Sequence, residues 1–461
     1  MALASCLALP LKYPLEEVRA LAHDAIDEWV DGLAPFFEEG KRPKISELSD
    51  HFTRSRSQFF GACLKAAIEK LYPEELDRQW AGCPQCGKRL KRKRLDSKEL
   101  STLHGSFGLE RPYFYCADCE FGFHPLDALL DVAPEKHQYD IQAKSTLTAA
   151  RLPYGESAEL FGSLTGICVG DHFQHDVLNA VGEAAILEEV VPERLEIERR
   201  IHKAIGQSGK KPVLVVTSDG ANVPTRPKAG RKAKRGPGCY QQAKGFRLYL
   251  LNEKDRIIHL ISWHQIQEAQ QFSEDLAFVA GRIPQDKVDI ALLADGAEFL
   301  WTAMTRCFPD GRQILDFYHC SEHVHKVATA HYGEGTLHAH EWAESILIRL
   351  SMGEPERVMG ILKRLKPKKA PAKEEIRKLI NYLEKQRHRI HYLSDLENGF
   401  PIGSGAIESA NKFICHNRMK RSGAWWIKEN GNAMLRVRCA IYNGTFNRIF
   451  DHYKKINQRG P

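Results

Sequence analysis

Two apolar runs that each lead into an Asp-Gly pair constrain the fold of this chain most. The first, at 213–216, is followed by Asp219-Gly220, and the second, at 288–293, is followed by Asp295-Gly296. Short runs rich in β-branched residues are typical of buried strands, and glycine allows a turn where a strand ends. Asp219 alone could simply begin a turn. Because the pattern occurs twice, we expect two strands that bring both carboxylates to one edge of a sheet.

A third acidic residue, Glu408, lies much later in the chain. Ser404 is a favourable helix N-cap, which predicts that Glu408 lies about one turn into a helix that continues towards Lys420. Carboxylate oxygens are the ligands that hard divalent cations prefer. Asp219, Asp295 and Glu408 together therefore predict a site for such cations.

Strands and helices alternate from residue 211 onwards. The predicted order is strands at 211–220, 245–251 and 256–263, a helix at 268–281, a strand at 288–293, a helix at 297–307 and a strand at 313–318. This is the order of an RNase H-like sheet, a mixed α/β core. The segment 320–395 reads as helical and is longer than a connection should be, which predicts a helical insertion. The predicted fold class is α/β, with an RNase H-like catalytic domain at 206–450.

Four cysteines form two C-x-x-C pairs, Cys83 with Cys86 and Cys116 with Cys119, with 29 residues between the pairs. Each pair can present two thiolates to one tetrahedral Zn²⁺, and the segment between them can fold back as a β-hairpin. A disulfide or redox pair is the alternative. His124 is a rival ligand, although four cysteines already complete the coordination shell. We expect a structural zinc ribbon at 81–135.

The rest of the chain is mainly helical by its apolar spacing. Residues 1–80 form a helical N-terminal region without recognisable chemistry. Residues 136–205 contain three short amphipathic pieces, which fit either a helix-turn-helix unit or a plain helical connector. Residues 451–461 form a tail.

Positive charge is clustered in this chain, whose formal net charge is +7. The clusters lie at 88–94, at 226–235 and at 363–369. Such runs are either solvated faces or contacts to a polyanion, and three of them favour a nucleic-acid partner. No apolar stretch approaches the roughly 18 residues of a membrane span. Scattered cysteines outside the two pairs suit a reducing cytoplasm.

These motifs resemble those of bacterial insertion-sequence transposases of the DDE class, in particular the Kra-type group, which is related to the Mutator-like transposases. The resemblance covers about 81–450 and rests on the predicted zinc ribbon and on the motifs at 218–220, 294–296, 316–319, 403–409 and 418–423, followed by Trp425-Trp426. It implies DNA strand cleavage and strand transfer with two Mg²⁺ or Mn²⁺ ions. Asp219 would bridge both ions, while Asp295 and Glu408 would each hold one.

The resemblance also suggests supporting residues. His319 would orient the scissile phosphate or its leaving group, with Asp316 as its structural partner, although a packed histidine fits equally well. Residues expected to contact DNA are Lys91, Arg92, Lys93, Arg94, Arg231, Lys232, Arg418, Lys420, Arg421 and Trp425. Trp425 and Trp426 could stack on an unpaired base or seal the last helix against the core.

The implied partner is double-stranded DNA, as transposon ends and as target, bound by a homo-oligomer in the cytoplasm at the nucleoid. A structure-specific nuclease of the same fold is an alternative, because hydrolysis and strand transfer use the same site. A non-catalytic zinc-ribbon regulator is the other alternative, but such a protein would be expected to have lost at least one of the three acids, and all three are present.

Overall fold

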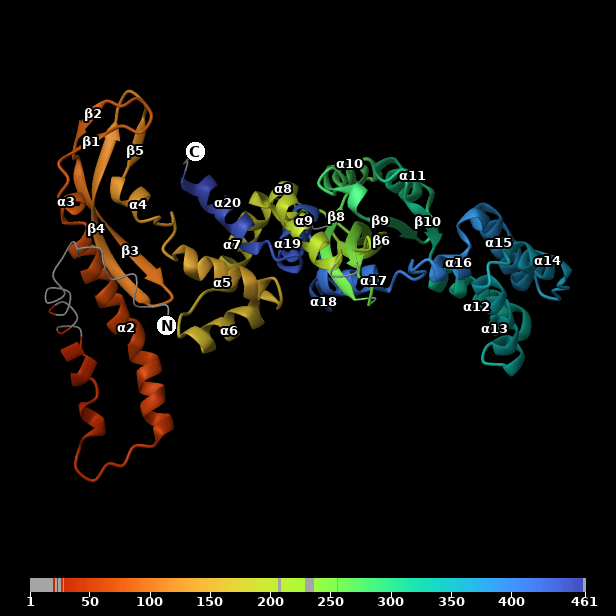
Figure 1. Cartoon of the computed structure of the whole chain (residues 1–461). Coiled ribbons are helices and arrows are strands. Elements are labelled where there is room, and N and C mark those ends of the chain that lie inside the picture. The colour runs from red at the N-terminus through yellow and green to blue at the C-terminus, as the bar shows by residue number, and fades with distance from the viewer. Residues whose placement is uncertain are drawn as a thin grey trace. The chain divides into compact units, whose positions relative to one another are not determined.

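The computed structural model describes residues 20, 23, 26, 27, 29–205, 209–228, 236–254 and 256–458 (Figure 1). The chain divides into two compact units, Met1–Leu178 with Asp451–Pro461, and Asn179–Phe450. Its secondary structure is mixed α/β, as predicted. Among the described helices, none combines the length and apolar character that a membrane crossing requires.

The first unit begins with η1 (Ala34–Phe36), the long helix α2 (Ile45–Leu71) and the short α3 (Pro73–Leu76). Much of the predicted N-terminal helical region before residue 29 lies outside the described residues. The start of α2 is fixed because the Glu47 carboxylate accepts the backbone N–H of Lys44 at 2.8 Å. Leu64 and Ile68 of α2 then pack on a buried cluster formed by Leu100, Phe107, Leu109 and Leu126.

Two small antiparallel sheets follow. The first pairs β1 (Trp80–Gly82) with β2 (Arg89–Lys91), and the second has the order β3-β4-β5, from β3 (Arg94–Thr102), β4 (Gly105–Cys116) and β5 (Phe121–Phe123). The predicted hairpin between the cysteine pairs is therefore confirmed, with Arg94 opposite Tyr113 and Thr102 opposite Gly105. The short helix α4 (Pro125–Leu129) contributes Leu126 to the cluster beneath this sheet.

The next helices are α5 (Tyr139–Ala149), α6 (Tyr154–Thr165) and α7 (Asp171–Ala184). They are the three helical pieces predicted here. Pro153 is the N-cap of α6, and Gly166 ends that helix with a φ of 73°. The predicted tail at 451–461 is helical up to residue 458, as the end of α20 (Phe446–Gln458). There Tyr453 donates to Gln142 of α5 at 2.8 Å, so this segment packs as part of the first unit.

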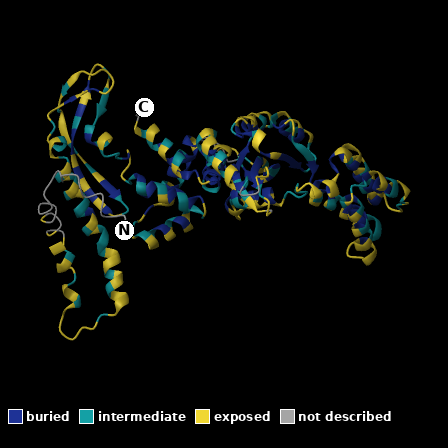
Figure 2. Ribbon diagram, in the orientation of Figure 1, coloured by how far each residue is buried: buried dark blue, intermediate teal, exposed yellow. Residues whose placement is uncertain are grey.

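The second unit is built on a five-stranded sheet with the order β10-β9-β6-β7-β8. The central strand β6 is antiparallel to β7, which is antiparallel to β8, whereas β9 runs parallel to β6 and β10 parallel to β9. The centre of this unit is largely buried (Figure 2). Its elements in chain order are α8 (Leu187–Val190), α9 (Arg194–Ile205), β6 (Val213–Thr225), β7 (Cys239–Leu251), β8 (Ile257–Ile266), α10 (Ala269–Ala280), η2 (Gln285–Lys287), β9 (Asp289–Ala294), α11 (Glu298–Cys307) and β10 (Arg312–Leu315).

The predicted order of strands and helices is confirmed, but the end of the first strand was predicted wrongly. β6 does not stop at Asp219-Gly220; pairing with β7 continues through Gly220 opposite Lys244 as far as Thr225. Gly220 is not at a turn, and its lack of a side chain makes room for Gln242, whose Nε2 would lie 2.1 Å from an added Cβ. At the second Asp-Gly pair the prediction is right, because β9 ends at Ala294 and Gly296 has a φ of 105°.

The predicted helical insertion consists of helices that gather beyond the β10 edge of the sheet (Figure 1). They are α12 (Phe317–Tyr332), α13 (Leu337–Ser351), α14 (Pro355–Arg364), α15 (Ala370–Gln386), η3 (Arg387–Arg389) and α16 (Tyr392–Glu397). The insertion begins slightly earlier than predicted, because β10 ends at Leu315. His319 therefore lies on the first turn of α12 and does not end a strand.

The chain then returns to the sheet. Helix α17 (Gly405–Asn411) packs on β6 and β7, and it continues through a π-helical turn, η4 (Lys412–His416), into α18 (Asn417–Met419). The next long helix, α19 (Lys428–Asn443), packs along β8. A π-helical turn inside a helix is frequently found next to functional sites. Here it follows directly after the turn that carries Glu408.

Candidate functional site

Asp219 and Asp295 lie on neighbouring parallel strands. The last paired residues of β6 and β9 are Thr217 and Leu293, and each acid follows two residues beyond that pair. Asp219 is half-buried within β6, and Asp295 is half-buried just after β9. Parallel strands therefore bring the two predicted carboxylates to adjacent positions on the sheet.

Glu408 reaches the same region from α17. This helix lies over β6 and β7, and its backbone is fixed by Arg247 of β7, a buried side chain that donates to the carbonyl oxygen of Ala406. Ser404 occupies the predicted N-cap position, but its side chain does not cap the helix. Its hydroxyl instead contacts the Glu408 carboxylate at 3.3 Å. Glu408 itself is exposed to solvent.

Asp295, Glu408 and His319 are close enough to Asp219 for their charges to act on its carboxylate. The pKa of Asp219 is raised above its ordinary value, mainly by burial and also by the negative charges of Asp295 and Glu408. The backbone N–H of Gly220, which donates to Asp219 at 2.6 Å, and the positive character of His319 act in the opposite direction. Two of the neighbouring groups thus oppose the ionised form of Asp219, and a bound cation would relieve that repulsion.

The carboxylates are nevertheless not gathered as tightly as ligands of a single ion. Over the described part of the chain, the four cysteines are the one group of such ligand atoms that all lie within 4.8 Å of one another. Acids that serve two ions about 3.5–4 Å apart can be spaced more widely than this. Carboxylate oxygens are the kind of ligand that hard divalent cations prefer.

Asp316 connects the segments that carry His319 and Glu408. It is the N-cap of α12 and is almost wholly buried. One oxygen of its carboxylate accepts the backbone N–H of His319 at 2.8 Å, and the other accepts the backbone N–H of Ser404, also at 2.8 Å. Asp316 is thus a structural partner of His319, as predicted, but through the backbone rather than the imidazole ring.

The helical insertion supports the turn that follows β9. The hydroxyl of Tyr382 on α15 donates to the carbonyl oxygen of Asp295 at 3.0 Å, and the side-chain amide of Gln386 donates to that of Gly296 at 3.1 Å. The ring of Tyr382 also lies 4.5 Å from that of His323 on α12. The insertion therefore holds the Asp295 turn and the His319 helix together. No pattern in the sequence pointed to Tyr382 or Gln386.

Three further acids lie close in sequence to the predicted site residues. Asp289 is exposed at the start of β9, and Glu298 is exposed on the first turn of α11. Glu322 lies one turn after His319 on α12, with its carboxylate 3.9 Å from the imidazole. These residues provide matched controls for the three predicted ligands.

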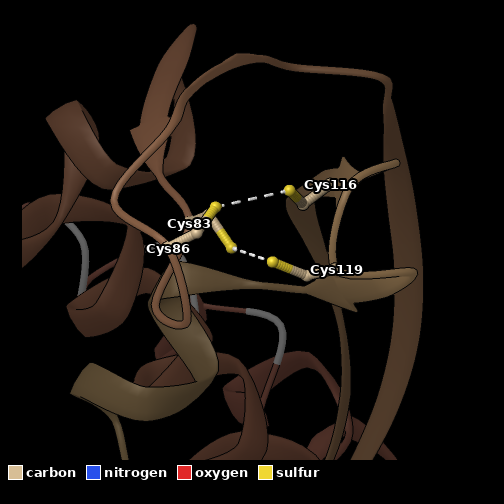
Figure 3. A group of neighbouring side chains, drawn as sticks. All are labelled: Cys83, Cys86, Cys116 and Cys119. Atoms are coloured by element: carbon tan, nitrogen blue, oxygen red, sulfur yellow. Dashed lines mark hydrogen bonds between the residues drawn. The ribbon is translucent and has the colours of Figure 1, made fainter.

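The four paired cysteines of the first unit come together as predicted (Figure 3). The Sγ atoms of Cys83 and Cys119 lie 3.9 Å apart, and those of Cys86 and Cys116 lie 3.8 Å apart. Sulfur atoms around a tetrahedral Zn²⁺ with Zn–S bonds of about 2.3 Å would be about 3.8 Å apart. All four are free thiols, so the disulfide alternative is not supported. The group could hold a metal ion such as zinc.

The turn at the first cysteine pair ends at a glycine in the left-handed conformation. Gly87 has a φ of 76° and donates its backbone N–H to the carbonyl oxygen of Cys83 at 2.9 Å. Burial raises the pKa of Cys83, but hydrogen bonds from the backbone of Cys86 and Gln85 lower it overall to about 7. A lowered thiol pKa favours the thiolate that binds metals, whereas the hydrogen bond with the Cys86 thiol raises the pKa of Cys119 to about 12. His124, the rival ligand, contacts Asp96 at 3.2 Å and is not part of the cysteine group.

The basic run beside the cysteines is partly engaged within the protein. Arg92 contacts Asp77 at 3.5 Å, and Arg94 pairs with Asp96. Lys93 lies over the ring of Tyr115 at 4.8 Å, while Lys91 is exposed on β2. These contacts hold the positive charges at the surface of the small sheets.

The residues at 418–426 that were predicted to contact DNA differ in their exposure to solvent. Lys420 and Arg421 are exposed, and Trp425 is 37% exposed with its ring 5.9 Å from that of Tyr240. Arg418, in contrast, is only 3% exposed and lies 5.1 Å from the centre of the Trp426 ring. Its prediction as a surface contact was therefore wrong, because its position on the inner face of α18 buries it. Arg231 and Lys232 lie outside the described residues.

Trp426 seals the chain against the sheet, as one of the two interpretations expected. Its indole N–H donates to the carbonyl oxygen of Met419 at 3.1 Å, and its backbone N–H donates to that of Pro224 at 3.0 Å. The backbone N–H of Arg226 in turn donates to the carbonyl oxygen of Trp426 at 2.9 Å. The segment after α18 is thereby joined to the end of β6, next to the basic loop between β6 and β7.

Comparison with protein families shows which family most of the chain is related to. Residues 41–455 match the Uncharacterised protein family UPF0236, and the protein belongs to this family. A comparison with curated proteins gave no match. The family match spans the cysteine group, the five-stranded sheet and the helices that carry His319 and Glu408.

Proposed function

We propose that this protein is a DNA transposase of the DDE class, which cleaves the ends of an insertion sequence and joins them to target DNA. The observation that carries the proposal is the position of Asp219, Asp295 and Glu408. Two adjacent parallel strands and one returning helix bring their carboxylates near enough for the charges of Asp295 and Glu408 to act on Asp219. Such sets of acids are typical of two-metal phosphoryl transfer.

The sheet topology supports this proposal. Three antiparallel strands followed by two parallel ones, in the order β10-β9-β6-β7-β8, are what an RNase H-like core requires. In that interpretation α12 to α16 are an insertion between the last strand and the helix with the third acid. The insertion would help to position Asp295, because Tyr382 and Gln386 donate hydrogen bonds to the turn after β9.

Asp219, Asp295 and Glu408 would hold Mg²⁺ or Mn²⁺. Bound ions of this kind stabilise the negative charge that develops on the attacking and leaving oxygens of the phosphate. His319, half-buried on the first turn of α12, would donate a hydrogen bond to the scissile phosphate or the leaving oxygen. Asp316 keeps that histidine on a fixed helix start.

DNA contacts would come from both units. Lys91, Arg92, Lys93 and Arg94 would lie against phosphates beside a zinc-bound cysteine group, with Arg92 and Arg94 exchanging their carboxylate partners for phosphate. In the second unit Lys420 and Arg421 would bind phosphate, and the exposed rings of Trp425 and Tyr240 would stack on an unpaired base. A DNA substrate implies that the protein acts at the nucleoid in the cytoplasm, as a homo-oligomer that holds two DNA ends.

The test uses purified full-length protein and labelled duplexes that carry the DNA flanking both sides of its gene. In Mg²⁺ or Mn²⁺ we expect strand cleavage at a defined position and, with an added target duplex, a joined product. Cleavage without a joined product would indicate a structure-specific nuclease of the same fold. Sequence-specific binding without cleavage in either metal would contradict the proposal and favour a regulator.

A further inference from the structure

A row of three residues crosses the sheet at the height of Asp219. On β7 the residue opposite Asp219 is Gly245, and on β8 the residue opposite Gly245 is His264. Gly245 has no side chain to separate Asp219 from His264. A Cβ at this position would lie 2.0 Å from Cδ2 of His264, so the imidazole occupies the place where a side chain of β7 would be.

Asn411 closes the gap between His264 and Asp219. It is the last residue of α17, three positions after Glu408, and is 3% exposed. Its side-chain nitrogen donates to Oδ2 of Asp219 at 2.7 Å, and its side-chain oxygen lies 2.8 Å from Nε2 of His264. The helix that carries the third acid therefore also contacts the first acid directly.

The direction of these hydrogen bonds follows from the chemistry of the groups. An ionised carboxylate can only accept, so the Asn411 atom facing Asp219 must be the NH₂ group. The oxygen of Asn411 then faces His264, whose Nε2 must carry a hydrogen and donate it. Burial lowers the pKa of His264 to about 4, which keeps the ring neutral at physiological pH. Its Nδ1 has no hydrogen-bond partner within the described structure, which fits the bare acceptor nitrogen of this tautomer.

We propose that Asn411, oriented by His264, is a positioning residue that holds the Asp219 carboxylate for metal binding. This inference rests on the proposed function. Gly220 and Asn411 each donate one hydrogen bond to a different oxygen of Asp219, which fixes the plane of the carboxylate and leaves each oxygen a further lone pair. Both donors are neutral. An arginine or lysine in the place of Asn411 would orient the carboxylate equally well but would cancel the charge that a cation needs.

The arrangement also couples two ligands. Asn411 and Glu408 are separated by less than one turn of the same helix, so a shift of α17 would move the third acid and release the first. Fixing ligands through neighbouring hydrogen bonds is a general feature of metal sites, and removing such a bond typically weakens metal affinity 10- to 100-fold. The position of Gly245 explains how the histidine can reach Asn411 from two strands away.

The test measures Mn²⁺ binding to the full-length protein without DNA, by electron paramagnetic resonance of free Mn²⁺, and the Mn²⁺ dependence of strand cleavage. For Asn411→Ala and His264→Phe we expect Mn²⁺ affinity to fall about tenfold or more, with a similar rise in the Mn²⁺ concentration for half-maximal cleavage. His264→Gln retains a donor and should recover much of the affinity. Asp219→Asn marks the effect of losing the ligand itself.

A matched control lies on the same strand. His259 of β8 is also buried, and its Nε2 lies 3.1 Å from the side-chain oxygen of Asn443 on α19. Asn443 uses its side chain to hold Ser262 of β8 and the carbonyl oxygen of Val190, so this pair serves packing away from the three acids. His259→Phe should therefore leave Mn²⁺ affinity unchanged at a comparable loss of stability. Equal loss of affinity in this control, or wild-type affinity in folded Asn411→Ala or His264→Phe, would overturn the inference.

The same measurement separates this inference from the proposed function. Wild-type protein that binds Mn²⁺ with the expected dependence on Asn411, but cleaves no DNA, would contradict the transposase proposal and support the positioning role. If the wild-type protein cleaves DNA but Asn411→Ala shows unchanged metal dependence, the transposase proposal is supported and the positioning role of Asn411 is contradicted. Wild-type protein that binds no Mn²⁺ would overturn both.

Discussion

One oxygen of the Asp316 carboxylate accepts the backbone N–H of Ser404 at 2.8 Å, across 88 residues of chain. Its other oxygen accepts the N–H of His319 at the start of α12. A single buried carboxylate thus ties the end of the helical insertion to its beginning. The neighbouring backbone bond, from the N–H of Phe317 to the carbonyl oxygen of Ile402 at 2.9 Å, reinforces the junction. The relative position of His319 and Glu408 depends on it.

Replacing Asp316 by alanine should destabilise the protein by about 2–4 kcal/mol, because two partly buried N–H groups lose a charged acceptor. Urea unfolding followed by fluorescence measures this loss. The control is Asp310→Asn on the exposed turn before β10, which should change stability by no more than about 0.5 kcal/mol. A loss no larger than that of the control would show that the insertion does not depend on this junction.

The cysteine group should contain about one equivalent of zinc per chain. Cys83→Ser and Cys116→Ser each remove one ligand, and metal analysis of either variant should show that most of the zinc is gone. Cys168→Ser is the matched control, because Cys168 is an exposed free thiol outside the group. Folded wild-type protein without zinc would show that the four thiols have another role.

The basic run beside the cysteines should contribute to DNA affinity through phosphate contacts. Changing Lys91 and Lys93 together to glutamine should weaken binding to all DNA sequences. The slope of log affinity against log salt should fall by nearly one for each lysine that no longer neutralises a phosphate. Arg377 and Lys378 on α15, which pair with Glu374 and Glu375, provide a control double variant. If affinity falls while the salt slope stays constant, the lysines act through folding.

Stability should decrease on mild acidification because two histidines are buried in neutral form. Burial lowers the pKa of both His259 and His264 to about 4, whereas an unfolded chain protonates histidine near 6.5. Between those values the unfolded state binds more protons, so the free energy of unfolding falls as pH falls from 6.5 towards 4 and is highest above 6.5. At pH 5 each histidine should account for a loss of about 2 kcal/mol.

Urea unfolding at pH 7 and pH 5 measures this dependence. His259→Gln should lose less stability between the two pH values than wild type, since one of the two groups no longer titrates. His202→Gln, at an exposed position on α9, should behave as wild type. Identical pH dependence in all three proteins would mean that other groups control the acid transition.

Local patterns in the sequence were sufficient for much of the fold. Apolar runs predicted the strands, and helical spacing predicted the insertion, because periodicity reflects which side chains a strand or a helix buries. The cysteine spacing predicted the four-thiol group because two C-x-x-C turns can each supply two ligands. Glu408 was placed correctly on a helix because Ser404 occurs at a favourable distance before it.

The errors and omissions come from contacts between distant parts of the chain. The extension of β6 beyond Gly220 depends on pairing with β7, and a glycine within a strand looks the same in sequence as one at a turn. His264, Asn411 and Tyr382 contact the acid-bearing segments only through tertiary packing. Of these, Asn411 had one usable signal, since its spacing of three from Glu408 places both on neighbouring helical positions.

Our central proposal is that three acids, Asp219, Asp295 and Glu408, act together in cutting DNA. The most direct measurement is single-turnover cleavage of a labelled transposon end by Asp219→Asn, Asp295→Asn and Glu408→Gln, each of which keeps the side-chain shape and removes the charge. The cleavage rate should fall at least about 1,000-fold in each variant, which corresponds to an activation barrier about 4 kcal/mol higher. DNA binding should persist. Asp289→Asn, Glu298→Gln and Glu322→Gln should cleave within about threefold of wild type. Full activity in any of the first three variants, or an equally inactive Glu298→Gln, would contradict a joint role for the three acids.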